Sequence, residues 1–252
     1  MTTALIMAGG RGDRLRASGA STPKPLVTVH GVPLLERNLL ALLSSGFRDL
    51  VVAVPNHTPE IARFVGTRGE ALAVSFGARL RVFEEIQPLG NIGAAAEVGT
   101  GDSDLVVVYA DNLTALDLNA LLRYHHQTNA ALTSAVHSEP FQIPYGEVQV
   151  ENGMIVAYNE KPERRIQVSS GVFVLGAAAI AQLPRGRRTE VAWLANRLLA
   201  GGCRVAAFQH EAPWIDVNDS AAIARAEQLI SHHKKAFESQ QATADPSEDA
   251  RQ

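Results

Sequence analysis

The stretch "MAGGRGDRLRASGASTPKPL" runs from Met7 to Leu26 and follows the apolar residues Ala4, Leu5 and Ile6. An apolar strand that leads into a glycine-rich loop is a common way for α/β proteins to build a phosphate site, because backbone N–H groups can face an anion only where no side chain intervenes. Several phosphate chemistries begin in this way. The stretch therefore predicts an α/β fold with a phosphate site and leaves the reaction open.

The glycine loop is compatible with several kinds of site. The P-loop sequence Gly-Lys-Ser/Thr is missing, and Leu15 stands where a dinucleotide fingerprint requires its third glycine. A glycine-rich turn without a ligand also fits Gly10-Arg11-Gly12. However, Arg14 can make a forked, charge-assisted contact with a phosphate, and Lys24 is a cation held between two prolines. Two fixed cations favour a nucleoside triphosphate whose phosphates react.

Length, composition and charge limit the class of protein. The chain has 252 residues, of which 46% are hydrophobic and 19% charged, and its formal net charge is -3. This length suits one large α/β domain or two small ones, and the near-neutral charge argues against a nucleic-acid partner. Cys203, the single cysteine, opens an apolar run interpreted as core. No apolar run approaches the ~20 residues that span a bilayer, so we expect a soluble, cytoplasmic protein without a membrane partner.

Apolar, β-branched runs alternate with helical patterns along most of the chain. This alternation predicts a mostly parallel sheet with helices on both faces. The expected strands are 4–8, 50–54, 80–83, 105–109, 131–136 and 170–175. The expected helices are 33–45, a weak one after Pro59, 118–127, 177–182, 189–199 and 221–235.

A hairpin interrupts the alternation. Residues 147–150 and 154–159 are strand-like and flank Asn152-Gly153, a pair that supplies hairpin turns. Residues 238–252 contain almost no apolar side chain and are expected to form a disordered polar tail. With no internal repeat or linker, residues 1–237 are interpreted as a single Rossmann-like, three-layer αβα domain with a mixed, mostly parallel sheet.

Six short motifs follow one another along the chain. They are "GGRGDRL" (9–15) with "PKP" (23–25), "EIQPLGNIGAA" (85–95), "YADN" (109–112), "YGEV" (145–148), "NEKP" (159–162) and "WIDVND" (214–219). In this order they resemble the motifs of the sugar-1-phosphate nucleotidyltransferases. The likeness is greatest to heptose- and mannose-1-phosphate guanylyltransferases and to short uridylyl- and thymidylyltransferases, and it implies a GT-A-like fold.

The resemblance implies a reaction between a nucleoside triphosphate and a sugar 1-phosphate. An oxygen of the sugar phosphate attacks the α-phosphorus in line and pyrophosphate leaves, which requires positioning and charge neutralisation rather than a protein nucleophile. By resemblance, Arg14 contacts the departing phosphates, Lys24 the α-phosphate and Lys161 the sugar phosphate. A lone arginine or lysine is usually a solvated surface charge, so these roles depend on the motifs.

Two aspartates are expected to bind magnesium. Asp111 follows the most hydrophobic strand, at the edge where open α/β sheets bind ligands, and Asp216 follows Trp214-Ile215. Converging carboxylates suit Mg²⁺, which prefers oxygen ligands and bridges phosphates. Taken singly, Asp111 could equally cap a helix and Asp216 could be a turn residue. Asp219 is the better cap for the final helix, which leaves Asp216 free for the metal.

The resemblance also assigns the substrate-binding residues. Two charge-assisted hydrogen bonds from guanine to Glu85 slightly favour GTP over UTP or dTTP, for which the amide of Gln87 is the expected partner. The expected nucleotide-binding residues are Met7, Ala8, Gly9, Gly10, Gly12, Arg14, Glu85, Gln87, Gly90 and Gly93. The expected sugar-phosphate-binding residues are Asn112, Tyr145, Gly146, Glu160, Lys161, Ser170 and Gly171.

The sequence departs from the family pattern at several positions. Asp13 replaces the usual threonine or serine, which places a carboxylate near the phosphates. Asn91 and Ile92 replace Thr-Ala, and Ser169 stands where many members have an asparagine that contacts the sugar. These departures leave the sugar and the base open.

Two other functions stay open at this stage. A glycosyltransferase of the same fold usually carries Asp-x-Asp after a strand, and Asp111-Asn112-Leu113 lacks it. A nucleotide-sugar sensor without turnover would be expected to lack Lys24 or a metal carboxylate, and the chain has both. The pairs His125-His126 and His232-His233 are expected at the surface. The sequence indicates no oligomer surface, although a homo-oligomer is compatible with it.

Overall fold

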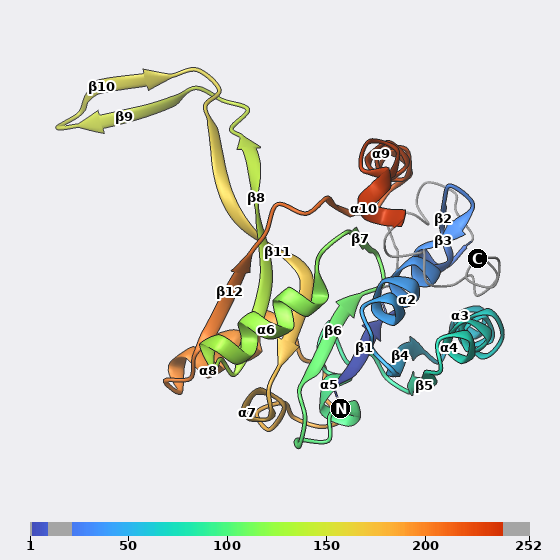
Figure 1. Ribbon diagram of the computed structural model, residues 1–252. Helices are drawn as coiled ribbons and strands as arrows, with labels where there is room; N and C mark the ends of the chain where they lie inside the picture. Colours follow the sequence, from blue (N-terminus) through green and yellow to red (C-terminus); the bar gives the residue numbers. More distant parts are fainter. Residues whose placement is uncertain (1, 10–21, 239–252) are drawn as a thin grey trace.

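The computed structural model describes residues 2–9 and 22–238, and its centre is a seven-stranded sheet (Figure 1). The strand order is β12-β8-β11-β6-β1-β4-β5; β11 runs antiparallel to both neighbours, and the other pairs are parallel. The predicted mixed, mostly parallel α/β sheet is therefore confirmed. Its strands are β1 (Thr3–Met7), β4 (Asp49–Pro55), β5 (Arg79–Glu85), β6 (Leu105–Tyr109), β8 (Leu132–Gln142), β11 (Glu163–Leu175) and β12 (Val205–Gln209).

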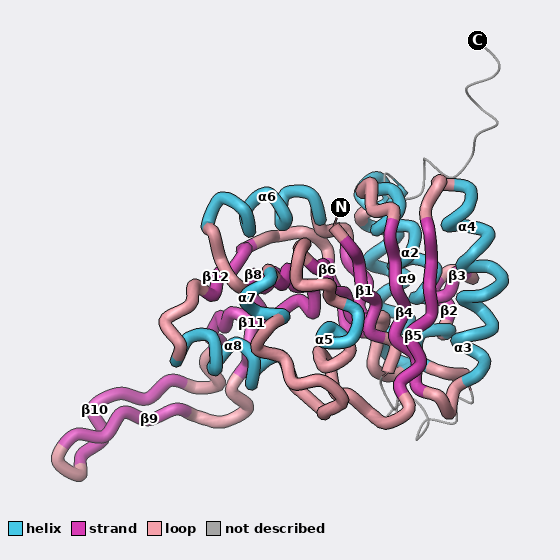
Figure 2. The backbone as a smooth tube through the Cα atoms, turned by 90° about the horizontal axis from the view of Figure 1, so that it is seen from below, coloured by secondary structure: helices cyan, strands magenta, loops and turns pink. Residues whose placement is uncertain are grey.

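Helices cover both faces of this sheet, with α6 on one side and α5, α7 and α8 on the other (Figure 2). The longer helices are α2 (Leu34–Ser44), α6 (Leu118–Thr128), α8 (Val191–Ala200) and α9 (Ser220–His232). The shorter ones are α3 (Pro59–Phe64), a π-helical turn (Val65–Gly69), α4 (Glu70–Ser75), α5 (Ala95–Val98), α7 (Ala177–Ile180) and α10 (Lys234–Glu238).

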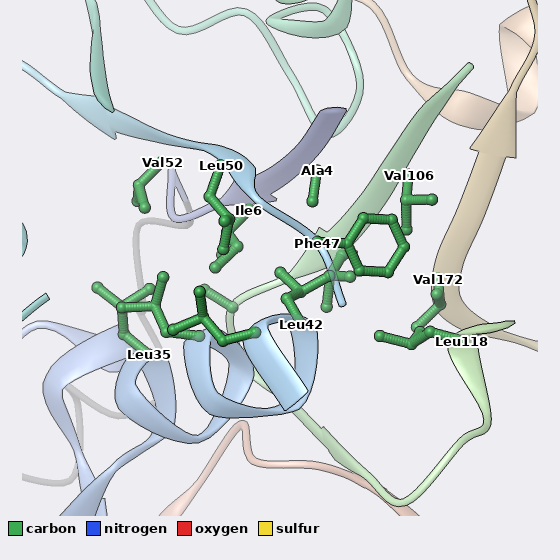
Figure 3. Packing of buried hydrophobic residues seen from close by; sticks show 14 of the residues in the cluster. Ala4, Ile6, Leu35, Leu42, Phe47, Leu50, Val52, Val106, Leu118 and Val172 are labelled. Carbon is green, nitrogen blue, oxygen red and sulfur yellow. The ribbon is translucent and has the colours of Figure 1, made fainter. Parts of the chain in front are cut away.

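The two layers of core follow from the alternation of side chains along β1. Ile6 lies in a buried cluster with leucines of α2 and α6, whereas its neighbour Leu5 lies in a second cluster under α5, α7 and α8. Figure 3 shows Ile6 and Leu50 of the sheet together with Leu35 and Leu42 of α2. Because successive strand residues face opposite sides, a continuous apolar strand such as β1 must be covered on both faces.

The sequence predicted six strands of the sheet correctly but did not predict the edge strand β12. All six expected strands are present, but the run 203–208, interpreted only as core, contains the edge strand β12. The prediction that His125 lies at the surface is wrong: this residue is 4% exposed, and its Nδ1 lies 2.8 Å from the Thr133 hydroxyl oxygen. Burial lowers the pKa of His125. His125 lies on the side of α6 that faces the sheet, together with Leu118 and Leu121. The pair His125-His126 alone does not show which of the two histidines lies on that side.

A two-stranded arm projects from the body of the molecule (Figures 1 and 2). We define the arm as residues 139–166, which comprise the outer parts of β8 and β11 and the hairpin of β9 (Glu147–Glu151) and β10 (Met154–Asn159). Asn152 and Gly153 join the hairpin with φ angles of 49° and 81°. Positive φ at both positions is what a tight hairpin turn requires, so the predicted turn is confirmed.

A third apolar cluster closes the end of the fold near α9 and α10. It joins the small hairpin of β2 (Thr28–Val29) and β3 (Val32–Pro33) to these helices, and Phe237 of α10 is 3% exposed within it. Of the predicted tail, Glu238 ends α10 and 239–252 lie outside the described residues. Within the described ranges, no helix has the length and apolar character needed to cross a membrane.

Phe237→Ala is expected to lower the free energy of unfolding by about 3 kcal/mol, because it removes a buried ring and leaves a cavity in the third cluster. Denaturant unfolding monitored by circular dichroism measures the change. Val74→Ala is the matched control, since Val74 is 68% exposed and should change stability little. Equal stability of both variants would contradict the anchoring role of α10.

Candidate active site

The candidate site lies at the carboxyl ends of β1 and β6. These strands are neighbours, with Met7 opposite Tyr109, and the backbone N–H of Ala110 donates to the Met7 carbonyl at 3.0 Å. Parallel strands that end side by side bring the segments after them to one edge of the sheet. Gly9 and Asp111 therefore lie at the same edge.

A lysine lies between two carboxylates at this edge. Lys24 Nζ donates to Asp111 Oδ2 at 2.6 Å and to Asp216 Oδ1 at 3.3 Å. The lysine side chain is only 11% exposed. Partial removal from water strengthens the attraction between these charges. The structure thus brings together three residues that were selected from separate motifs.

A short β-ribbon explains why the two aspartates converge. Strand β7 (Asn112–Thr114) pairs antiparallel with β13 (Trp214–Asp216), and Asp216 lies opposite Asn112. The N–H of Val217 also donates to the carbonyl of Asp111 at 3.0 Å. Backbone hydrogen bonds therefore fix the spacing of two carboxylates that are far apart in the chain.

Neither aspartate caps a helix. Asp117 caps α6, and Asp219 caps α9 by accepting a hydrogen bond from the Ala222 N–H at 2.6 Å. The expected cap at Asp219 is confirmed. Asp216 instead accepts a hydrogen bond from the Asn218 amide at 3.1 Å.

One carbonyl group anchors both strands of the ribbon. The Ser170 carbonyl accepts from Asn112 Nδ2 at 2.7 Å and from Trp214 Nε1 at 2.8 Å. Gly171 follows with a φ of 68°, and a side chain there would collide with the Asn112 amide. Asn38 of α2 adds a second anchor, donating to the carbonyls of Asn112 at 3.1 Å and Ala110 at 3.3 Å. The backbone on both sides of Asp111 is therefore fixed.

The Ser170 side chain is held in turn by two imidazoles. Its hydroxyl lies 2.8 Å from His137 Nδ1 and 2.8 Å from His210 Nε2, and His137 Nε2 lies 3.0 Å from Glu139. Ser170 is fully buried. Burial, and then the nearby His137, lower the pKa of His210. This chain of hydrogen bonds fixes the position of the anchoring carbonyl, and the Ser170 hydroxyl is not open to solvent.

A hollow of about 340 Å³ has Asp111 in its wall. Its wall contains five residues that were predicted from sequence, namely Met7, Gly9, Glu85, Gly90 and Asp111. It also contains five that were not predicted, namely Pro88, Asn91, Tyr109, Arg188 and Glu190. The volume is in the range of small-molecule sites.

Glu85 brings a buried carboxylate to this hollow. It is 4% exposed, its Oε2 accepts a hydrogen bond from the Leu89 N–H at 3.2 Å, and its Oε1 is buried with no hydrogen-bond partner among the described residues. Burial raises the pKa of Glu85, and the Leu89 hydrogen bond opposes this only in part. A side chain at Gly9 would begin 3.4 Å from Oε2. An unpaired carboxylate oxygen in a hollow can accept a hydrogen bond from a ligand.

Tyr109 contributes a second polar group without a partner. Its hydroxyl is buried and makes no hydrogen bond to the part of the chain that the structure describes, while its ring lies 5.4 Å from the ring of Phe173. Burial, and then the charges of Glu190 and Asp111, raise the pKa of Tyr109. The phenol therefore remains a hydrogen-bond donor at neutral pH. Tyr109 is the last residue of the predicted strand 105–109, and this position at the carboxyl end of a strand is the sequence signal that could have identified it as a site residue.

Two loops pack tightly to form one side of the hollow. The N–H of Thr189 donates to the Leu89 carbonyl at 2.8 Å, and a side chain at Gly90 would overlap the Thr189 carbonyl. Gly93 is equally enclosed by the backbone. The Gln87 amide donates to the Gly186 carbonyl at 2.7 Å, and Gln87 is absent from the described wall of the hollow. No sequence pattern indicated that Arg188 and Glu190 would reach the site, because this packing joins segments about one hundred residues apart.

The remaining predicted residues lie elsewhere. Ala8 is buried beside Gly9, and Gly10, Gly12 and Arg14 lie outside the described residues. Tyr145, Gly146, Glu160 and Lys161 all belong to the arm, where Tyr145, Glu160 and Lys161 are exposed and Gly146 packs against Tyr158. The structure therefore does not bring the four arm residues to the hollow of the same chain.

Comparison with known proteins identifies the family. The family model described as nucleotidyl transferase matches residues 3–233. The chain therefore belongs to the nucleotidyl transferase family.

Individual relatives carry different substrate names. The chain is 28% identical to a mannose-1-phosphate guanylyltransferase of Mycobacterium tuberculosis over 221 residues, covering 85% of this chain and 60% of the relative. It is 26% identical to a UTP–glucose-1-phosphate uridylyltransferase of Synechocystis over 230 residues, covering 85% of this chain and 59% of the relative. The chain thus spans about three fifths of the length of these relatives.

A solved structure shares the fold. HddC from Yersinia pseudotuberculosis, crystallised with GMP-PN, superposes with a TM-score of 0.69 at 20% identity, covering 90% of this chain and 99% of that one. At this level of identity the likeness concerns the fold.

Glu85→Gln is expected to raise Tm by roughly 2–4 °C at neutral pH, because it removes a buried charge without removing the acceptor for Leu89. The raised pKa means that ionised Glu85 costs stability once the pH exceeds its ordinary value of 4.5 and then its folded value. The gain should therefore shrink as the pH falls through that interval. Scanning calorimetry across pH measures it, with exposed Glu84→Gln as the control; an unchanged Tm at neutral pH would refute the cost of burial.

Proposed function

We propose that the protein transfers a nucleoside monophosphate from a nucleoside triphosphate to a sugar 1-phosphate and releases pyrophosphate. The observation that carries this proposal is the convergence of Lys24 and Asp216 on Asp111, which lines the hollow of about 340 Å³. Family membership over residues 3–233 supports the same reaction. The reaction needs a cation at the α-phosphate and a rigid edge, and the anchored β-ribbon supplies that edge.

Lys24 acts on the α-phosphate in this proposal. Its Nζ is held by two carboxylates, so its position is fixed before a ligand arrives. Negative charge shifts onto the phosphate oxygens as the sugar phosphate attacks, and a fixed ammonium stabilises that charge without reorganisation. Arg14, which lies outside the described residues, is proposed to contact the departing phosphates.

Asp111 and Asp216 are proposed to hold Mg²⁺. Their oxygens converge on one point, now bonded to Lys24, and no group of three or more His, Cys, Asp or Glu in the described residues could hold a metal. Two carboxylates fit magnesium, because this ion keeps several waters and takes its other ligands from substrate phosphates. When bound, the ion supplies charge neutralisation to those phosphates.

GTP is the proposed nucleotide. The free oxygen of Glu85 can accept from the N1–H and amino group of guanine, which are adjacent donors. Gln87, the expected partner of a pyrimidine, already donates its amide to Gly186. Both observations favour a purine with two donors over uracil or thymine.

Kinetics with a panel of nucleotides test the base. Purified protein, Mg²⁺ and mannose 1-phosphate or glucose 1-phosphate are combined with GTP, UTP, dTTP, CTP or ATP, and pyrophosphate release gives kcat/KM. GTP is expected to exceed the others by more than about tenfold, and Glu85→Gln should lower kcat/KM for GTP by about tenfold, the value of roughly one charge-assisted hydrogen bond. A pyrimidine preference would refute this assignment and point to Gln87. Glu84→Gln is again the control.

Asp111→Asn and Asp216→Asn are each expected to lower kcat by at least ~100-fold, the scale on which loss of one electrostatic contact to a transition state slows catalysis. The fold should persist, because asparagine keeps the size of the side chain. Asp219→Asn serves as the matched control, since asparagine caps helices as well as aspartate and should leave kcat unchanged. Near-normal rates in both site variants would exclude the two-carboxylate site.

A further inference from the structure

The hairpin at the end of the arm has one apolar and one polar face. Val150 lies opposite Ile155, and Val148 lies opposite Tyr158, so these four side chains share a face. The opposite face is mostly polar: it carries Glu147, Gln149, Glu151 and Asn159, together with Met154 and Ala157. Such alternation is typical of a sheet that is buried on one side.

This apolar face is uncovered in the single chain. Its four side chains are 42–63% exposed, and nine of the fourteen large apolar side chains exposed in the described residues belong to the arm. An isolated two-stranded sheet is marginally stable in water, and an apolar patch of this kind marks an interaction surface. The arm therefore has the character of an element that packs against another surface.

The arm also carries residues that its own active site cannot reach. The β8–β11 ladder is paired without interruption from Glu163 to Ser169, and the N–H of Ile143 extends it to the carbonyl of Pro162. At 3.3 Å per residue, the rod formed by the paired run from Glu163 to Ser169 is about 20 Å long, and Lys161 lies beyond its outer end, far from Ser170, whose carbonyl anchors the site. The register shift lies between Ser169 and Phe173, next to the site. Bending there swings the rod but keeps its tip at the same distance.

The described cations at the site are already paired with carboxylates of the same chain. Among the described residues, Lys24 pairs with two carboxylates, and Arg188 of the hollow pairs with Glu190 at 3.1 Å. A sugar 1-phosphate brings two negative charges at neutral pH, and Arg14, outside the described residues, is already proposed to contact the departing phosphates, so a further cation would favour its binding. Lys161, at the exposed end of the arm, is a cation of this kind.

We propose that the arm packs on a second copy of this chain and delivers Glu160 and Lys161 to the partner's site. A two-fold exchange satisfies both requirements at once, because each apolar face is covered and each site gains the cation that its own arm holds at a distance. In Figure 1 the arm extends beyond the edge of the sheet at which β7 lies, so an exchanged arm can reach the corresponding edge of a partner. The proposal deepens the proposed function and rests on it for the roles of Glu160 and Lys161.

Analytical ultracentrifugation tests the interface independently of turnover. The wild-type protein is expected to sediment as a dimer at micromolar concentration, and the double variant Val150→Glu/Ile155→Glu as a monomer with an unchanged circular dichroism spectrum. Gln149→Glu on the polar face and Val74→Glu on α4 are matched controls that should remain dimeric. A monomeric wild-type protein overturns the proposal, as does a dimer that survives the double variant.

Complementation tests the exchange itself. Lys24→Ala and Lys161→Ala are expected to be inactive alone, whereas an equal mixture that has been dissociated and reassociated should regain about one quarter of wild-type activity, since half of the dimers are mixed and each contains one intact site. No recovery, with mixed dimers demonstrated by tagged pull-down, overturns delivery to the partner. A dimeric wild-type protein that releases no pyrophosphate with any nucleotide would refute the proposed function and leave the interface standing.

Discussion

The contact of the Lys24 ammonium with Asp111 and Asp216 is the interaction on which the site depends. It joins three segments that are distant in the sequence, and its charges neutralise one another in a partly buried position. Without the lysine, two carboxylates would face each other at the end of a short β-ribbon. Their like charges repel, so this arrangement is unfavourable unless a cation lies between them. The same arrangement prepares the edge for phosphates, because a cation and two oxygen ligands already share one point.

The hydrogen bonds behind this contact make the arrangement rigid. The Ser170 carbonyl accepts hydrogen bonds from Asn112 and Trp214, and the Ser170 hydroxyl is held between His137 and His210. Asn112, His137 and Ser170 are buried, where an unpaired polar atom is costly and a paired one is geometrically specific. Catalysis by positioning requires such support, because small displacements of charged groups reduce the stabilisation of a transition state.

The polar groups of the hollow are not paired in the way that the groups around Ser170 are. Glu85 Oε1 and the Tyr109 hydroxyl are buried and lack partners within residues 2–9 and 22–238, although most buried polar atoms in proteins are paired. Burial of Glu85 opposes its ionisation and therefore works against stability at neutral pH. A ligand that donates to the carboxylate and accepts from the phenol would remove both costs. Arg37 Nε and His210 Nδ1 are the other buried side-chain atoms without a partner among the described residues, so two of the four such atoms belong to residues of the hollow where a nucleotide is proposed to bind.

The sequence by itself determined six strands of the central sheet, the long helices and the Asn152-Gly153 turn, because these depend on local periodicity and on backbone conformations that few residues adopt. Its motifs also selected Lys24, Glu85, Asp111 and Asp216, whose chemical types suit phosphate and base. Only the tertiary structure decided that Lys24, Asp111 and Asp216 converge and that the carbonyl of Ser170 anchors the ribbon beside them. It also decided that Lys161 lies on a projecting arm. Each of these depends on contacts between segments far apart in the chain, and such contacts leave no mark in local sequence. The burial of His125 and the edge strand β12 were missed for the same reason.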